Sequence, residues 1–419
     1  MVIASAMQPI WRFMVENNTQ LKEMIRSMVI DLLQGQKQEA ASSQPVKQAP
    51  RGQVEPGVFD TVDDAIQAAK AAQARFEDCT LATREKVIAD IRATMRPRVQ
   101  ELAQKTVEET GMGRVADKVL KLNLTLDKTP GVEDLVTECE TGDNGMTLYE
   151  LSAYGVIGAI TPSTNPAETL ICNTIGMLAA GNAVFFSVHP GAKHLSRLLV
   201  SELNQIIAKS IGIENLIVTL REPSIESAQE MMLHPDVSLL VVTGGPGVVK
   251  QALQSGKKVI GAGAGNPPAF VDETADIKKA AQDIVLGASL DNNILCIAEK
   301  SVVAMRQIEP QLVQEMVKAG CVLIDNQQDI QRLVDLTVLP NGTPNKKFVG
   351  KNASVILDAA HIPYNGDPRL IIMRTPKDHP FAVIEMLMPI LPVVTVDSFD
   401  EGLDVCLMLE AGLHHTATM

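Results

Sequence analysis

The sequence lacks the features that mark a membrane-spanning, an exported or a zinc-binding protein. No uninterrupted apolar run approaches the roughly 18 residues that a membrane-spanning helix needs. The N-terminus lacks the basic-then-apolar order and the small-residue cleavage site of a secretory signal, so no export is expected. No C-x-x-C pair occurs, and His414 and His415 have no partners at metal-ligand spacing, so no metal site is predicted.

The cysteine pattern and the net charge indicate which cellular environment and which partners are expected for the protein. The six cysteines are scattered, which fits no disulfide framework and predicts a reducing, cytosolic environment. The 419 residues carry a net charge of −13, which argues against nucleic acid as the main partner. With 46% hydrophobic and 21% charged residues, the composition is that of a soluble globular protein of about two or three domains.

Residues 1–35 contain an amphipathic helix, predicted over 16–34, whose apolar residues recur at a spacing of three and four. Residues 36–57 are rich in Gln, Ala, Ser and Pro without an apolar period, which predicts a flexible linker. A helix on such a tether either docks back on its own protein or binds a partner. Met14 directly precedes the helix region and is a candidate natural start.

The rest of the chain predicts an α/β fold. Residues 60–120 are expected to be helical, with helices over 61–76, 81–95 and 99–111, and short apolar alternation within 129–152 predicts a β-hairpin arm. Strands and helices then alternate from residue 155, and a second α/β unit starts at residue 276. Repeated strand–helix units predict parallel, doubly wound sheets, which bind ligands beyond the carboxyl ends of their strands.

One thiol stands out in the segment 287–303, GASLDNNILCIAEKSVV. An Asp-Asn-Asn turn delivers Cys296 into an apolar run that is followed by Glu299 and Lys300. Two interpretations are open from this stretch alone. An isolated cysteine among Ile and Leu is often a buried small hydrophobe; the alternative is a catalytic thiol whose reactivity depends on its surroundings.

Loops at the predicted strand ends carry further candidates, each with a structural alternative. Asn165 in ITPSTNP either donates to a developing oxyanion or serves only the turn. Gly244, Gly245 and Gly247 in VTGGPGVV either admit a phosphate at a helix N-terminus or form a tight turn, and they do not match GxGxxG. Glu385 precedes the rigid segment MLMPILP and either holds ribose hydroxyls or is a surface carboxylate.

Together these segments resemble the aldehyde dehydrogenase superfamily, most closely its CoA-acylating branch, the propionaldehyde and acetaldehyde dehydrogenases of bacterial microcompartments. Five stretches match in the family's order: ITPSTNPAET, FFSVHP, VVTGGPGVV, DNNILCIAEK and EMLMPILPVV. The resemblance covers about residues 58–419. It implies two doubly wound parallel-sheet domains, one that binds NAD (58–128 and 153–270) and one that is catalytic (271–419), with 129–152 as an oligomerisation arm.

The resemblance also implies a mechanism. The Cys296 thiolate attacks the aldehyde carbon, and the Asn165 amide and the Cys296 backbone N–H hold the oxyanion. Hydride passes to NAD and leaves a thioacyl-enzyme, which coenzyme A attacks to release acyl-CoA. The implied NAD contacts are Thr161, Pro162, Ser163, His189, Thr243, Gly244, Gly245, Val248, Gly261 and Glu385.

Two departures from the wider family matter. Hydrolytic aldehyde dehydrogenases carry a Glu that activates water, whereas the equivalent stretch here, GAGAGNPP at 261–268, has no carboxylate. The thioester on Cys296 is therefore expected to wait for CoA. In SVHPGA, His189 stands near the position of the Lys that contacts the adenosine ribose, so NAD rather than NADP is implied by the family alone. The alternatives are a hydrolytic aldehyde dehydrogenase and a catalytically inactive, shell-associated protein.

Partners and location follow from the same resemblance. Residues 16–34 are similar to the encapsulation peptide that docks cargo enzymes on shell proteins, which implies the bacterial cytoplasm, inside a microcompartment. Family members form homo-oligomers, expected here as a dimer or tetramer, and continue for some tens of residues beyond Met419, so a truncated C-terminus is expected. The sequence does not distinguish propionaldehyde from acetaldehyde, because one methylene is worth only ~1–3 kcal/mol, and no basic cluster marks a CoA pocket.

Overall fold

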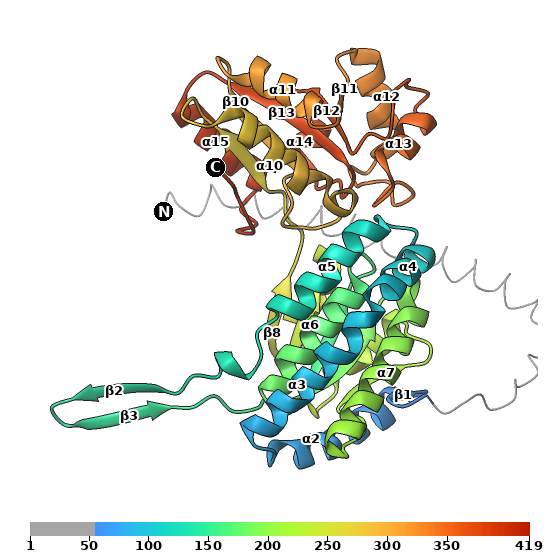
Figure 1. Cartoon of the computed structure of the whole chain (residues 1–419), viewed down its shortest axis with the longest axis vertical. Coiled ribbons are helices and arrows are strands. Elements are labelled where there is room, and N and C mark those ends of the chain that lie inside the picture. Colours follow the sequence, from blue (N-terminus) through green and yellow to red (C-terminus); the bar gives the residue numbers. More distant parts are fainter. Residues whose placement is uncertain (1–54) are drawn as a thin grey trace, which may run out of the picture. The chain divides into compact units, whose positions relative to one another are not determined.

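The computed structural model describes residues 55–419, and two parallel sheets organise this part of the chain (Figure 1). The predicted helix at 16–34, Met14 and the linker up to residue 54 lie outside the described residues. The α/β fold with two doubly wound parallel sheets is confirmed. None of the described helices is long and apolar enough to cross a membrane.

The first sheet has the order β1-β6-β5-β4-β7-β8, and every neighbouring pair is parallel. Its strands are β1 (Val58–Phe59), β4 (Val156–Thr161), β5 (Ala183–Val188), β6 (Ile217–Leu220), β7 (Val237–Thr243) and β8 (Lys258–Ala262). The chain runs outward from β4 to β5 and β6, then returns to the other side of β4 with β7 and β8. The order therefore reverses between β4 and β7, and ligands of such sheets bind at this switch point.

Helices cover both faces of the first sheet. The connections run in both directions along the sheet, and crossovers between parallel strands are normally right-handed. The helices are α2 (Val62–Glu77), α3 (Leu81–Met95), α4 (Val99–Thr110), α5 (Val115–Lys128), α6 (Pro166–Ala179), α7 (Lys193–Ile211), α8 (Ile225–Leu233) and α9 (Pro246–Leu253). The crossovers through α6 and α7 run in one direction along the sheet, and those through α8 and α9 run in the other. Figure 1 shows α6 and α7 on one face, with α3 packed outside them.

The second sheet has the order β11-β12-β13-β10-β9 and is also parallel throughout. Its strands are β9 (Pro268–Val271), β10 (Ser301–Met305), β11 (Cys321–Leu323), β12 (Leu370–Arg374) and β13 (Ile390–Val396). Its helices are α10 (Ile277–Ser289), α11 (Glu309–Lys318), α12 (Gln327–Thr337), α13 (Ala353–Ala359), α14 (Pro380–Val383) and α15 (Phe399–Glu410). Strand β9, the first of this sheet, begins at Pro268; the domain boundary predicted after residue 270 stays a prediction.

Two elements bear on the predictions for residues 99–152. The predicted hairpin is present as the antiparallel pair β2 (Glu138–Gly142) and β3 (Gly145–Tyr149), exposed on both faces and extended away from the first sheet in Figure 1. Its role as an oligomerisation arm stays a prediction. Helix α5 continues past residue 120, where the predicted helical region ends. It buries Lys118 and Lys121, and lysines in a sequence pattern normally indicate the solvent-facing side of a helix.

Asn266 fixes the segment that joins the two sheets. Its side chain is buried, and Nδ2 donates to the backbone carbonyls of Ala382 and Leu409, each at 2.8 Å. These bonds connect the start of β9 to the ends of α14 and α15. The segment that leads from the first sheet to the second sheet is therefore held at one defined position.

We predict that Asn266→Ala lowers the free energy of unfolding of this half by roughly 2 kcal/mol, because two hydrogen bonds are lost and two buried carbonyls become unpaired. A lowered thermal midpoint in calorimetry measures this. Gln311→Ala, on the exposed face of α11, is the control and is expected to stay within about 0.5 kcal/mol. Equal midpoints for the two variants would contradict the prediction.

Candidate active site at the carboxyl ends of the strands

The predicted nucleotide contacts meet at one edge of the first sheet. Strands β5, β4, β7 and β8 are neighbours and parallel, so their carboxyl ends lie side by side. Thr161 ends β4 and is followed by Pro162 and Ser163, and His189 follows β5. Thr243 ends β7 and is followed by Gly244 and Gly245, and Gly261 lies in β8. The structure thus brings them together at the switch point, and their contacts with NAD stay a prediction.

The turn between β7 and α9 has the form of a phosphate cradle. Gly245 is the N-cap of α9, and no side chain caps the helix. Pro246 has no N–H and the Val248 N–H donates to the Gly245 carbonyl at 3.2 Å, so the Gly247 N–H is the first-turn donor left for an anion. A β-carbon at Gly244 would lie 2.7 Å from Cγ1 of Val248, and one at Gly261 would lie 3.1 Å from Cγ1 of Val249. Glycine is therefore required where the backbone approaches the helix, and the residues present fit the pyrophosphate of a dinucleotide.

A cavity of about 510 Å³ opens beside this turn. It is lined by residues of α9, by residues 261–264 at and after the end of β8, and by Leu413, His414 and His415. The C-terminal residues reach this place because Thr418 pairs with β9: the N–H of Phe270 donates to the Thr418 carbonyl at 2.9 Å. The cavity therefore joins the phosphate turn to the tail of the second half.

The turn that precedes Cys296 is strained and buried. Asp291, Asn292 and Asn293 have φ values of 51°, 57° and 63°, in the left-handed region that Asp and Asn tolerate best among non-glycine residues. All three are buried in the short helix η4 (Leu290–Asn293). Nδ2 of Asn293 donates to the carbonyl of Ala288 at 2.6 Å and to that of Glu299 at 2.9 Å. These bonds close the segment into a loop that presents Cys296.

Lys300 fills the inside of this loop. Its ammonium donates to the carbonyls of Asn293, Leu295 and Ala298 at 3.2, 2.6 and 3.3 Å. Burial lowers the pKa of Lys300 to about 8, against the opposing effects of Glu385, Cys296 and Glu299. Lys300 thus organises the loop that presents Cys296 and brings a positive charge within electrostatic reach of the thiol.

Cys296 and Glu385 meet around Gly265. A β-carbon at Gly265 would lie 2.8 Å from the Cys296 carbonyl oxygen, and the backbone amide of Gly265 lowers the pKa of the Glu385 carboxyl. Burial raises the pKa of the Cys296 thiol, and the Glu385 charge raises it further, whereas Lys300 lowers it. Burial also raises the pKa of Glu385. The half-buried thiol therefore sits between a carboxylate and an ammonium, and the segment packed on it carries no acid.

Asn165 follows β4 as the N-cap of α6 and makes no side-chain cap bond. Its Oδ1 accepts from the ammonium of Lys121, and its Nδ2 donates to Oγ1 of Thr164 at 3.2 Å. Lys121 also contacts Asp291 at 2.6 Å. Asn165 is thereby linked to the turn before Cys296, and its role as an oxyanion donor stays a prediction.

Sequence reasoning missed His415, which it weighed only as a metal ligand. The Cγ and Cδ2 atoms of its ring would lie 2.8 and 2.9 Å from a β-carbon at Gly265, so the imidazole covers the same glycine that touches Cys296. Among the residues that the structure describes, no group of His, Cys, Asp and Glu could hold a metal ion. The signal for His415 lies in the pairing of Thr418 with β9, which periodicity does not reveal.

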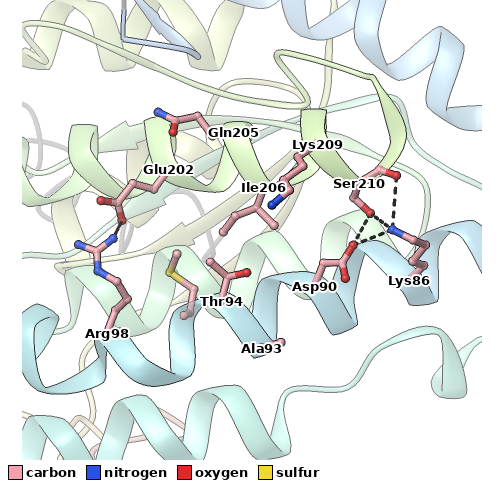
Figure 2. Close-up of a pocket in the computed structure, with 11 residues that line it drawn as sticks. Lys86, Asp90, Ala93, Thr94, Arg98, Glu202, Gln205, Ile206, Lys209 and Ser210 are labelled. Carbon is pink, nitrogen blue, oxygen red and sulfur yellow. Dashed lines mark hydrogen bonds and ion pairs between the residues drawn. The ribbon is translucent and has the colours of Figure 1, made fainter.

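A second cavity, also of about 510 Å³, lies between α3 and α7 (Figure 2). Its charged groups largely neutralise one another, because Arg98 pairs with Glu202 at 2.6 Å and Lys86 pairs with Asp90 at 2.8 Å. Its lining includes none of the predicted site residues. The groove between α3 and α7 is therefore separate from the site built here.

We predict that Glu385→Gln shifts the alkylation of Cys296 to lower pH. The substitution removes a negative charge that opposes thiolate formation, so the pKa of Cys296 falls. The measurement is the rate of iodoacetamide labelling against pH, read on the Cys296 peptide by mass spectrometry. Asp404→Asn, on an exposed face of α15, is the control, and a Glu385→Gln profile that matches it would refute the assigned electrostatics.

Comparison with known proteins agrees with this geometry. The family model for the aldehyde dehydrogenase family matches residues 33–417. A CoA-propanoylating propanal dehydrogenase of Salmonella typhimurium is 48% identical over 404 residues, covering 96% of this chain and 84% of the relative. The acetylating acetaldehyde dehydrogenase EutE of the same organism is 44% identical over 371 residues, covering 87% of this chain and 79% of the relative.

Solved structures give the same result. A propionaldehyde dehydrogenase of Rhodopseudomonas palustris with bound CoA and an acylated cysteine has a TM-score of 0.84 at 47% identity, covering 87% of this chain and 83% of that chain. A propionaldehyde dehydrogenase of the Clostridium phytofermentans fucose utilisation microcompartment has the same TM-score, identity and coverage. The resemblance read from the five sequence stretches is confirmed, and the chain belongs to the aldehyde dehydrogenase family.

Proposed function

We propose that this protein is a CoA-acylating aldehyde dehydrogenase, which oxidises a short-chain aldehyde with NAD and CoA to acyl-CoA and NADH. The aldehyde is propionaldehyde or acetaldehyde, as in the names of the similar enzymes. One observation carries the proposal: the segment packed against Cys296 at Gly265 is glycine-rich and has no carboxylate to activate water. A thioester on Cys296 therefore meets a thiol rather than an activated water.

In the first half of the reaction, Cys296 is the nucleophile. Its thiolate attacks the aldehyde carbon, and the thiol proton leaves to solvent or to a neighbouring base. The Nδ2 group of Asn165 and the Cys296 N–H donate to the oxyanion of the resulting thiohemiacetal. NAD supplies a hydride acceptor when bound at the switch-point edge. The Gly244–Gly245 turn would hold its phosphates, and Glu385 would hold a ribose.

In the second half, the CoA thiol attacks the thioacyl carbonyl, and Cys296 is the leaving group. The same two N–H donors hold the second oxyanion. The His415 ring covers Gly265, against which Cys296 also packs, and we assign His415 to receive the CoA proton. The open cavity beside Leu413 and His414 gives CoA a route to the thioester.

The decisive assay mixes the protein with NAD and propionaldehyde, with and without CoA. Without CoA we expect a burst of NADH limited to the number of active sites, and with CoA continued turnover to propionyl-CoA. Cys296→Ala should abolish both phases, whereas Cys172→Ala, at an exposed position, should retain them. Steady NADH formation without CoA, with propionate as the product, would select the hydrolytic alternative. Absence of any NADH with intact folding would select the inactive, shell-associated alternative.

We also propose that residues 16–34 bind a microcompartment shell protein and place the enzyme inside a microcompartment in the bacterial cytoplasm. The amphipathic pattern followed by a linker supports this, as does the microcompartment origin of a similar enzyme. The homo-oligomer predicted from the family, a dimer or tetramer, belongs to the same proposal.

Deletion of residues 1–35 should leave the rate of acyl-CoA formation unchanged and abolish co-sedimentation with a purified shell protein. Ile25→Ser, on the predicted apolar face, should weaken binding about as much as the deletion. Glu23→Ser, on the polar face, is the matched control and should bind normally. Loss of catalysis in the deletion variant would instead assign the segment to the folded enzyme.

A further inference from the structure

A cluster of buried charges links α5 to the turn before Cys296. The ammonium groups of Lys118 and Lys121 both contact Oδ2 of Asp291, at 2.8 and 2.6 Å. The side chains of Lys118 and Asp291 are 0% exposed, and that of Lys121 is 7% exposed. Buried ions cost free energy unless they are paired and hydrogen-bonded. The reaction as described uses none of these three groups.

The two lysines differ in their second partner. Lys118 donates to the backbone carbonyl of Thr164 at 3.1 Å, whereas Lys121 donates to the side-chain Oδ1 of Asn165. An ammonium has donors and no acceptor, so the amide atom that faces Lys121 has to be the oxygen. The Nδ2 group of Asn165 is thereby turned to the other edge, where one of its two N–H groups donates to Oγ1 of Thr164 at 3.2 Å. The contact with Lys121 is the one that requires the oxygen to lie on the Lys121 side, because the Thr164 hydroxyl could donate or accept.

The charge on Lys121 is maintained despite its burial. Burial opposes the charged form, but Glu168 at 3.3 Å and Asp291 outweigh it and raise the pKa of Lys121 above its ordinary value. The ammonium is therefore present at neutral pH, and its bond to Asn165 is a charge-assisted one.

Asp291 in turn belongs to the turn before Cys296. Its Oδ1 accepts from the Arg114 N–H at 3.0 Å, and its own N–H donates to Oδ2 of Asp117 at 2.9 Å. Five residues later the chain reaches Cys296. One ammonium, that of Lys121, therefore contacts both the amide at the end of β4 and the turn that carries the thiol.

We propose that Lys121 is a positioning residue for the acylation step. It holds the Asn165 amide with its N–H edge toward the aldehyde oxygen, and it joins this amide through Asp291 to the turn that presents Cys296. The proposal rests on the proposed function, because it takes Asn165 as the oxyanion donor. Such a donor stabilises the transition state only if its direction is fixed before the reaction.

The test is the NADH burst in a single turnover with propionaldehyde and NAD in the absence of CoA. Removing one oxyanion donor costs about 10²–10³-fold in rate, and a donor that has lost its orientation loses part of that. We expect Lys121→Met to slow the burst by about 10-fold to 100-fold. The pH profile of Cys296 alkylation should stay that of the unmodified protein, because Lys121 acts on the amide and not on the thiol.

Lys118→Met is the matched control, since it removes an equally buried lysine from the same helix and the same carboxylate but leaves the Asn165 bond in place. It should slow the burst by less than about threefold. The double variant separates positioning from a general structural effect. If Lys121 acts through Asn165, Lys121→Met should cause almost no further loss in an Asn165→Ala background.

Equal losses from Lys121→Met in the two backgrounds would overturn the proposal, and so would an unmodified burst rate in Lys121→Met. The unmodified protein reports on the proposed function separately: if it gives no burst, that function fails, and if it gives one while Lys121→Met is equally fast, only this inference fails.

The Lys121→Met variant could fail to fold, so a second pair of variants is included. Neither carboxylate oxygen of Glu168 makes a hydrogen bond among the described residues, and Lys121 is its ion-pair partner. Loss of Lys121 would leave that buried charge uncompensated. If Lys121→Met fails to fold, the same comparison is made between Lys121→Met/Glu168→Gln and Glu168→Gln, where a 10-fold or greater difference supports the proposal and equal rates overturn it.

Discussion

The carboxylate of Asp291 is fully buried, and donors from three residues of one segment hold it: the ammonium groups of Lys118 and Lys121 and the N–H of Arg114. It starts a run of three left-handed residues, a conformation that costs an L-residue roughly 1–2 kcal/mol. Such a turn persists only where surrounding contacts over-determine it. Helix α5 packs against α6, which follows β4. The same contacts therefore fix the turn before Cys296 relative to the edge of the first sheet where the predicted nucleotide contacts lie.

The chemistry then depends on what surrounds the thiol rather than on the thiol itself. Burial and Glu385 disfavour the thiolate, and Lys300 favours it while organising the loop through three carbonyls. Gly265 admits the Cys296 carbonyl and the His415 ring at one point, where any side chain would collide with both. The segment 261–268 packed at this point has no carboxylate to activate water. This absence is what the proposed transfer of the acyl group to CoA depends on.

Much of this could be predicted from the sequence, because the signals were local. Gly and Pro at the ends of apolar runs predicted the strand-end loops, and the five ordered stretches identified the family. The burial of Lys118 and Lys121 in α5 could not be predicted. Periodicity places a lysine in solvent, and only tertiary packing against Asp291 explains why these two are buried. His415 was missed for a similar reason: its approach to Gly265 depends on the pairing of Thr418 with β9, more than 140 residues earlier in the chain.

The most direct test of the central claim is the mass of the enzyme after incubation with NAD and propionaldehyde in the absence of CoA. The account predicts a gain of one propionyl group per chain, located on the peptide that contains Cys296 and lost again on addition of CoA with formation of propionyl-CoA. An enzyme that forms NADH under these conditions while Cys296 stays unmodified, or an acyl group that CoA does not remove, would contradict it.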